Sequence, residues 1–255
     1  MSSAAFWSER VRRYGHTGWS DAATYWYDQR LRLKAIDATV LVPWPAGQAS
    51  ALDFGCGVGD FCALLSRRFA HVVGYDVSAD VLARARECNA PPNVVYTAQL
   101  DEALESRHDL ILSVTVLQHV VQDEDVRILL SRFAAALAVG GRVAVMETLG
   151  TAESSSDYLK RRTLPQLLAL FDSAGFAPVS QHGFYHPSEC PTPQYRAYRS
   201  RPGVRVLGRL AGMKLPFSEA LLRRIAQRDA AQDKSFLAHA ASPTQILVFS
   251  RKGDK

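Results

Sequence analysis

The chain has few cysteines and no long apolar run. Its 255 residues include only Cys56, Cys62, Cys88 and Cys190, and none of these form a CxxC pair. Such spacing fits neither a disulfide framework nor a zinc site, so we expect reduced thiols and no metal. No segment approaches the ~18 consecutive apolar residues of a membrane-spanning helix, and residues 1–14 lack the apolar stretch of a signal peptide. These absences predict a cytoplasmic protein without a membrane partner.

Composition places the chain among ordinary globular proteins. Apolar residues make up 47% and charged residues 22%, which is enough to fill a core without disulfides or metals. The length favours one domain with a sizeable insertion. The net charge of +5 is uneven, because residues 1–150 carry 14 basic and 17 acidic side chains and residues 151–255 carry 16 and 8. The basic part either attracts an acidic or phosphorylated partner or solvates the surface.

Short apolar segments alternate with helical ones through most of the chain. Strands are expected at 51–54, 71–76, 94–97, 110–114, 142–147, 176–183 and 245–250. Helices are expected at 60–69, 78–88, from Asp123 or Asp125 to about Val139, and at 163–173, with Gly140 and Gly141 ending the third. The alternation predicts an α/β, Rossmann-like fold with a seven-stranded, mostly parallel sheet and helices on both faces.

Two regions depart from the alternation. Residues 1–45 are rich in aromatics and are expected to form a helical leader, with a helix from Ser20 or Asp21 to about Leu41. Residues 187–242 form an insertion before the last strand, with a helix capped by Ser218. We therefore expect a single domain made of the leader, a core at 46–186, the insertion, and a last strand and tail at 243–255.

The strongest motif is a glycine-rich turn between the first strand and the next helix. It reads Asp53-Phe-Gly-Cys-Gly-Val-Gly-Asp60. A tight turn without Cβ atoms lets a ligand lie against bare backbone, and the amides at the helix start then face that ligand. Asp76, about 20 residues further on at the end of the second strand, is placed to accept both hydroxyls of a ribose. Together these two features predict an adenosine-containing ligand.

The spacing of the glycines distinguishes between nucleotide ligands. A dinucleotide fingerprint reads GxGxxG, and its third glycine position is occupied here by Asp60. The stretch from Asp53 to Gly59 instead closely resembles the DxGxGxG motif of class I S-adenosylmethionine-dependent methyltransferases. The likeness extends over about residues 48–180, and the pattern is nearest to the small-molecule methyltransferases of ubiquinone and menaquinone biosynthesis.

The resemblance implies a set of cofactor contacts. By that likeness Asp53, Gly55 and Gly57 line the methionine end of S-adenosylmethionine, and Asp76 and Val77 hold the ribose and one adenine face. Leu100 covers the other adenine face, and Ser113 lies beneath the sulfonium. The family usually has an acidic residue after the third strand to accept the adenine amino group. This chain offers Gln99, whose amide oxygen can accept the same bond, with Asp101 as the alternative.

Two side chains at strand ends are candidates for chemistry. The activated methyl sulfonium needs a nucleophile held in line that loses its proton. His119, just past the fourth strand, is either that base or a structural histidine packed against the loop. Glu147, at the end of the fifth strand, is expected to face the crevice and to bind or deprotonate a substrate.

Substrate contacts are expected from three places. The leader from Tyr14 through His16 to Trp19 is either a lid over the cofactor or a hydrophobic anchor for the first helix. His182 and His186 follow the sixth strand, where the family often contacts substrate, and their spacing with Glu189 does not favour a metal. The insertion carries arginines that suit phosphate or carboxylate, or solvate a surface arm: Arg196, Arg199, Arg201, Arg205 and Arg209.

The sequence favours an O- or N-methyltransferase of a small molecule, such as a natural product or a sugar-containing metabolite. The fourth strand leads into Ser113-Val-Thr-Val rather than the motif of amino-methylating DNA enzymes, so no nucleic-acid partner is expected. The alternatives are a nicotinamide oxidoreductase on the same fold and an inert cofactor-binding protein. A homodimer is left open.

Overall fold

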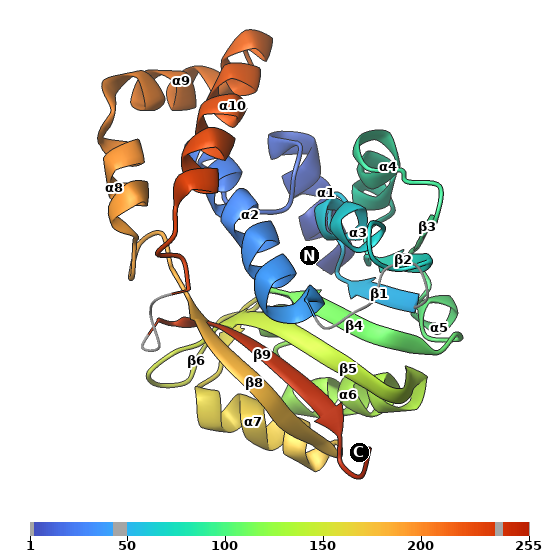
Figure 1. Cartoon of the computed structure of the whole chain (residues 1–255). Helices are drawn as coiled ribbons and strands as arrows, with labels where there is room; N and C mark the ends of the chain where they lie inside the picture. The colour runs from blue at the N-terminus through green and yellow to red at the C-terminus, as the bar shows by residue number, and fades with distance from the viewer. Residues whose placement is uncertain (1–2, 43–49, 238–241, 255) are drawn as a thin grey trace.

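The computed structural model describes residues 3–42, 50–237 and 242–254. Its centre is a seven-stranded sheet in the order β3-β2-β1-β4-β5-β9-β8 (Figure 1). β9 runs antiparallel to both its neighbours, and the other neighbouring strands are parallel. The strands are β1 (Ser50–Phe54), β2 (His71–Tyr75), β3 (Val94–Thr97), β4 (His108–Val114), β5 (Leu137–Thr148), β8 (Phe176–Phe184) and β9 (Thr244–Arg251). The predicted Rossmann-like, mostly parallel sheet is confirmed.

Helices cover both faces of the sheet because successive strand side chains point to opposite sides. In β4, Leu110 and Leu112 join one buried cluster and Ile111 joins the other. The first cluster lies against α3 (Asp60–Leu65) and α4 (Ala79–Cys88), and the second lies against α5 (Leu100–Ala103), α6 (Asp123–Ala136) and α7 (Leu164–Ser173). The central strands β1, β4 and β9 are buried on both faces over most of their length, which explains why they read as continuous apolar runs.

The leader folds into α1 (Ser3–Tyr14), α2 (Ala22–Ile36) and one turn of π-helix, η1 (Asp37–Leu41). The carboxylate of Asp21 accepts a hydrogen bond from the Thr24 amide at 2.7 Å, so it caps α2 as predicted. α2 lies in the first buried cluster beside the sheet (Figure 1). The predicted border between leader and core at residue 45 lies outside the described residues.

The insertion builds α8 (Pro193–Ser200), α9 (Pro202–Gly212) and α10 (Pro216–Gln232), and these helices pack on α2 (Figure 1). Buried hydroxyls tie the two regions together. Tyr195 Oη lies 2.8 Å from Thr24 Oγ1, and Tyr27 donates to the Asp233 carboxylate at 2.9 Å. The insertion therefore fixes the position of α2.

Several predicted boundaries are wrong. α6 ends at Ala136, and Gly140 lies inside β5, because the backbone from Leu137 pairs with β4 instead of continuing the helix. α10 begins at Pro216, so Ser218 does not cap it and its hydroxyl donates to the Leu215 carbonyl. Residues 150–162, for which no strand is predicted, contain a hairpin of β6 (Ser154–Ser155) and β7 (Lys160–Arg161).

Two further findings concern the described residues only. No helix among them is long and apolar enough to cross a bilayer. No group of three or more metal-ligating side chains occurs in residues 3–42, 50–237 and 242–254.

Candidate active site

A cavity of about 560 Å³ lies along the carboxyl edge of the sheet. Its lining includes Asp76 after β2, Gly55 after β1, Thr115 after β4, Thr148 at the end of β5 and His186 after β8. Neighbouring strands are ~4.8 Å apart, so these residues mark successive positions along one long crevice. Its volume lies within the range of roughly 300–1,000 Å³ that small-molecule sites occupy.

The glycine turn forms one wall of this cavity. Gly55, Gly57 and Gly59 have φ values of 76°, 54° and 83°, a left-handed region that favours glycine. The amides of Gly55 and Cys56 both donate to the Tyr75 carbonyl at 2.8 Å, which fixes the turn to the end of β2. A Cβ atom on Gly57 would lie 2.8 Å from Thr17 Oγ1. The turn therefore presents bare backbone to the cavity.

Asp76 sits beside the turn with its carboxylate held by backbone amides. Gly57 donates to Oδ2 at 3.1 Å and Ser78 donates to Oδ1 at 3.0 Å. Burial raises the pKa of Asp76 to about 6, although the hydrogen bonds from both backbone amides act to lower it. A carboxylate oxygen can accept a second hydrogen bond, so Asp76 keeps acceptor capacity toward the cavity. Val77 also lines this end.

Four other predicted cofactor residues do not line the cavity. Asp53 is 1% exposed and accepts a hydrogen bond from the Cys62 thiol, and burial raises the pKa of Asp53 to about 7. Gln99 is exposed, and Leu100 packs into the second buried cluster. Ser113 is fully buried, and its hydroxyl has no hydrogen-bond partner. Their predicted contacts with a cofactor stay predictions.

The leader covers the cavity from above the glycine turn. Phe6 and Trp7 of α1 line it, together with residues 17–20. Tyr158, from the β6–β7 hairpin, stacks on Phe6 with ring centres 5.4 Å apart. Arg10 donates to the carbonyls of Thr17 and Gly18, which fixes the loop after α1. The cover is thus made by two segments that lie far apart in the sequence.

Two leader residues predicted to touch substrate lie outside this lining. His16 is buried and stacks on Tyr25, with ring centres 3.4 Å apart. Burial lowers the pKa of His16 to about 3, so this imidazole stays neutral. Tyr14 packs beneath the guanidinium groups of Arg10 and Arg13. Both residues hold the leader in place.

His119 lines the cavity beneath this cover. Its Nδ1 lies 2.9 Å from the Tyr158 carbonyl, which can only accept, so Nδ1 carries the proton. Nε2 is then an acceptor, and it lies 3.3 Å from the side-chain amide nitrogen of Gln118. Burial lowers the pKa of His119. The imidazole is therefore neutral near pH 7 and able to take up a proton at Nε2.

Glu147 does not face the cavity, contrary to prediction. It is 2% exposed and accepts hydrogen bonds from the amides of Val116, Leu117 and Gln118 at 2.9–3.2 Å. Burial raises the pKa of Glu147 to about 7, although these amides act to lower it. The side chain turns inward because three free amides at the end of β4 need an acceptor. Its role is to hold the segment that carries His119.

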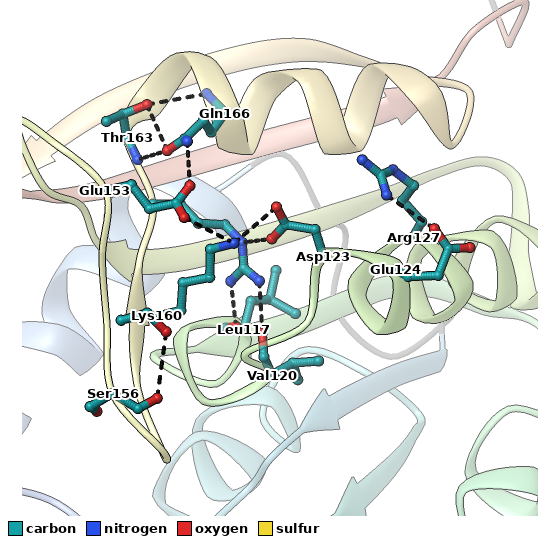
Figure 2. A network of polar contacts seen from close by, with 12 residues as sticks. Leu117, Val120, Asp123, Glu124, Arg127, Glu153, Ser156, Lys160, Thr163 and Gln166 are labelled. Atoms are coloured by element: carbon teal, nitrogen blue, oxygen red, sulfur yellow. Dashed lines mark hydrogen bonds and ion pairs between the residues drawn. The ribbon is translucent and has the colours of Figure 1, made fainter.

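The same segment is held from its other side by Arg162. This buried guanidinium donates to the carbonyls of Leu117 and Val120 and to the Asp123 carboxylate at 2.7–2.9 Å. Figure 2 shows the surrounding network, in which Lys160 bridges Asp123 and Glu153 at 3.0 and 3.3 Å. Residues 116–120 are therefore fixed through both their amides and their carbonyls.

The end of the cavity farthest from Asp76 is built from side chains. Asp28 and Arg32 of α2 form an ion pair at 2.6 Å, and Trp19 Nε1 donates to the same carboxylate oxygen at 2.8 Å. His186 lies beside Trp19, with ring centres 5.7 Å apart. Arg161 of β7 completes this end.

Two groups of predicted substrate residues fall outside the cavity lining. His182 lies in β8 opposite Ile246 of β9. None of the insertion arginines from Arg196 to Arg209 lines the cavity. Arg199 pairs with Asp21 at 2.9 Å and Arg201 pairs with Asp229 at 2.6 Å. The insertion acts on α2 instead, and the arginines that line the cavity are Arg10, Arg32 and Arg161.

Comparison with known proteins identifies the family. A family model described as "Methyltransferase domain" matches residues 25–189. The chain belongs to this methyltransferase family. An uncharacterised methyltransferase of Mycobacterium tuberculosis is 37% identical over 116 residues, 43% of this chain and 56% of that protein. A ubiquinone biosynthesis O-methyltransferase of Nitrobacter winogradskyi is 36% identical over 97 residues, 36% of each chain. The chain thus spans about half or less of the length of these relatives.

Solved structures share the methyltransferase fold. Phosphoethanolamine N-methyltransferase 2 of Haemonchus contortus, in complex with phosphomonomethylethanolamine and S-adenosylhomocysteine, superposes with a TM-score of 0.63. The alignment covers 99% of this chain and 60% of that one at 18% identity, so the likeness concerns the fold alone. The family match confirms the predicted methyltransferase family and the solved structures confirm its fold, so the nicotinamide alternative is set aside.

The residues at the β1–β2 end of this methyltransferase fit S-adenosylmethionine. The left-handed glycines leave a cradle that a Cβ atom would fill. Asp76 keeps acceptor capacity for ribose hydroxyls, and the carboxylates of Asp60 and Asp76 suit a ligand with a positive sulfonium. We call this end, lined by Gly55, Gly57, Asp60, Asp76 and Val77, the cofactor half. The acceptor half is the end lined by Trp19, Asp28, Arg32, Thr115, Arg161 and His186.

Proposed function

We propose that this methyltransferase moves the methyl group of S-adenosylmethionine to an oxygen or nitrogen atom of a small-molecule acceptor. The observation that carries the proposal is the single long cavity, in which a cofactor half and an acceptor half are continuous. His119 also lines this cavity. A donor and an acceptor bound together in it would be held in line, which is the main contribution an enzyme makes to such a transfer.

S-adenosylmethionine supplies an already activated methyl group when bound, so the protein has little chemistry left to do. We propose that His119 takes the acceptor proton at Nε2, because Nδ1 is already committed to the Tyr158 carbonyl. The leader, residues 1–45, acts as a lid that excludes water, through Phe6 and Trp7 of α1. Glu147 and Arg162 act through the backbone, by keeping His119 in position.

The acceptor we propose is acidic or phosphorylated, a class that includes natural products and sugar-containing metabolites. Arg32 and Arg161 line the acceptor half, where Asp28 is paired with Arg32, whereas the cofactor half carries the carboxylates of Asp60 and Asp76. A macromolecule such as a nucleic acid is a poor fit for a cavity covered by α1. We further propose a cytoplasmic location, where the four free cysteines stay reduced, and leave a homodimer to be measured.

The test is a labelling experiment with the purified full chain. The protein is incubated with methyl-labelled S-adenosylmethionine and an extract of its native cells, and labelled products are identified by mass spectrometry. We expect one labelled small molecule that is missing when the extract receives Asp76→Ala protein. Labelling of nucleic acid would contradict the acceptor class. If nothing in the extract is labelled, an inert cofactor-binding role replaces the proposal.

A further inference from the structure

The acceptor half contains a buried cation whose hydrogen-bonding capacity is only partly used. Arg32 has a side chain 10% exposed and lies on α2, whose position the insertion fixes. We propose that Arg32 is the acceptor-recognition residue, and that it binds a carboxylate or phosphate group of the acceptor. This inference rests on the proposed function, because it assumes that this half of the cavity receives the acceptor.

Arg32 is held in one orientation by its neighbours. Its Nε donates to Asp28 Oδ2 at 2.6 Å, four residues earlier on the same helix. The same oxygen accepts the Trp19 indole N–H at 2.8 Å, so Asp28 is itself fixed. A planar guanidinium anchored through Nε loses little further freedom when it binds a ligand through its other nitrogens.

The other guanidinium nitrogens of Arg32 have spare donors. Nη1 lies 3.4 Å from Thr115 Oγ1, and that hydroxyl donates to the Val114 carbonyl at 2.7 Å. Nη2 forms no hydrogen bond with any residue in the described part of the chain, and Arg32 lines the cavity. A guanidinium edge with free N–H groups matches the two oxygens of a carboxylate or phosphate. Unused donors at the wall of a cavity therefore indicate an oxyanion.

The surroundings of Arg32 favour negative charge in the ligand. The Asp28 side chain is 3% exposed and its Oδ2 already accepts from Arg32 and Trp19, so little of this carboxylate is open to the ligand. Among the described residues Arg161 pairs with Glu189 alone, and the Glu189 side chain is 47% exposed, so water screens this pair. His186 Nδ1 accepts from the amides of Ser188 and Glu189, so its Nε2 carries the proton. Further donors thus surround the proposed anion site.

Backbone strain occurs at the same place. Thr115 has φ of 56°, a left-handed conformation that a threonine rarely adopts. Its amide donates to the Met146 carbonyl, so the strained residue is fixed to β5. Such strain persists where the surrounding structure imposes it, and it gathers at ligand sites. Here it puts the Thr115 hydroxyl within reach of Arg32.

The test separates the anion site from the cofactor site. Full-length protein saturated with S-adenosylhomocysteine is titrated by calorimetry with inorganic phosphate and, separately, with citrate, each at roughly ten-millimolar concentration. The first variant is Arg32→Lys, which keeps the positive charge beside Asp28 but loses the planar guanidinium and its paired N–H donors. The second is the double variant Asp28→Asn with Arg32→Gln, which leaves no buried unpaired charge. Arg30→Gln, an exposed residue of the same helix, is the matched control.

We expect wild type and Arg30→Gln to bind one of the two anions saturably, and both Arg32 variants to bind it at least tenfold more weakly, since charge-assisted bonds are lost. Tighter binding of phosphate than of citrate would assign a phosphate monoester, and the reverse a carboxylate. S-adenosylhomocysteine affinity should change less than about twofold in every variant. Equal anion binding by Arg32→Lys, or no saturable binding of either anion by wild type, would overturn the inference alone. Failure of wild type to bind S-adenosylhomocysteine would overturn the proposed function.

Discussion

The two halves of the cavity are built in different ways. The cofactor half is formed largely by backbone, from the glycine turn at 55–59 and the amides around Asp76. The acceptor half is formed by side chains from α2, the loop after α1, β7 and the segments after β4 and β8. The carboxylates of Asp60 and Asp76 line the first half, and Arg32 and Arg161 line the second together with Asp28, which is paired with Arg32.

This difference indicates how each half responds to substitution. A backbone-built site depends on the absence of Cβ atoms, so it fails when glycine is replaced and tolerates most other changes. A site built from side chains can change its preferred ligand through one residue, because each of its contacts belongs to a separate segment. One half can thus stay fixed while the other varies. The following variants test this division, from the largest expected effect to the smallest.

Glu147 supports the segment between the two halves, and its replacement by Gln should alter stability most. Burial raises the pKa of Glu147 from 4.5 to about 7. A raised carboxyl pKa gives stability that is present below pH 4.5 and lost as pH rises through about 7. Between about pH 5 and pH 8 the free energy of unfolding of wild type should therefore fall by about 3 kcal/mol more than that of Glu147→Gln, as measured by urea unfolding. If the free energy of unfolding of the two proteins changes with pH in the same way, the raised pKa of Glu147 is contradicted.

His119→Ala tests the base at the junction of the halves. We expect kcat to fall about a hundredfold, because proton removal is lost, while calorimetry shows unchanged S-adenosylhomocysteine affinity. His71→Ala, an exposed histidine of β2, should leave both quantities unchanged. An equal loss of kcat and cofactor affinity would mean that His119 only packs against the lid.

Gly57→Ala tests the backbone-built half. The residue has φ of 54°, and its new Cβ would lie 2.8 Å from Thr17 Oγ1. The left-handed conformation and the contact together should weaken cofactor binding about thirtyfold. Gly203→Ala in α9 meets no atom within 4 Å and is the matched control. If Gly57→Ala binds like the control, the turn does not hold the cofactor.

Asp76→Ala should weaken cofactor binding at least tenfold, since charge-assisted hydrogen bonds worth ~1.5–3 kcal/mol are removed. The pKa of about 6 adds a pH test. Wild-type affinity should fall as pH drops through about 6, because the protonated acid accepts fewer hydrogen bonds, and Asp76→Asn should not show that step. Calorimetry across this pH range measures both effects. An unchanged affinity in Asp76→Ala would place the ribose elsewhere.

The smallest expected effect is on the acceptor KM, and it distinguishes recognition by the cavity from recognition by the insertion. Arg161→Gln should raise the acceptor KM roughly fivefold, because Arg161 lines the acceptor half. Arg196→Gln, at an exposed position of α8, should leave KM unchanged. Once the labelled acceptor is identified, steady-state kinetics can compare the two. If the two variants raise the acceptor KM equally, the insertion also takes part in substrate recognition.

The sequence predicts the sheet and the glycine turn because both are local. Continuous apolar runs mark strands buried on two faces, and the turn and Asp76 are read from short motifs. The end of α6 is predicted wrongly because pairing of Leu137 with β4 outweighs the helix-stop preference of Gly140 and Gly141.

The acceptor half could not be predicted, because its members meet only in three dimensions. Asp28 and Arg32 share a helix whose position is set by the insertion, and Arg161 lies in a hairpin for which the sequence predicts no strand. The four-residue spacing of Asp28 and Arg32 in the leader is the one local signal for this pair. Glu147 was placed correctly at a strand end, but its side chain turns toward free amides that no pattern reveals.

Trp7 and Trp19 line the cavity on the side that the leader covers. Indole emission depends on the polarity around the ring, so the enzyme carries its own optical reporter. Trp19 belongs to the acceptor half and contacts Asp28 and His186 there. Comparing wild type with the Trp7→Phe and Trp19→Phe variants would show by difference whether the emission change comes from the proposed lid or from the proposed acceptor half.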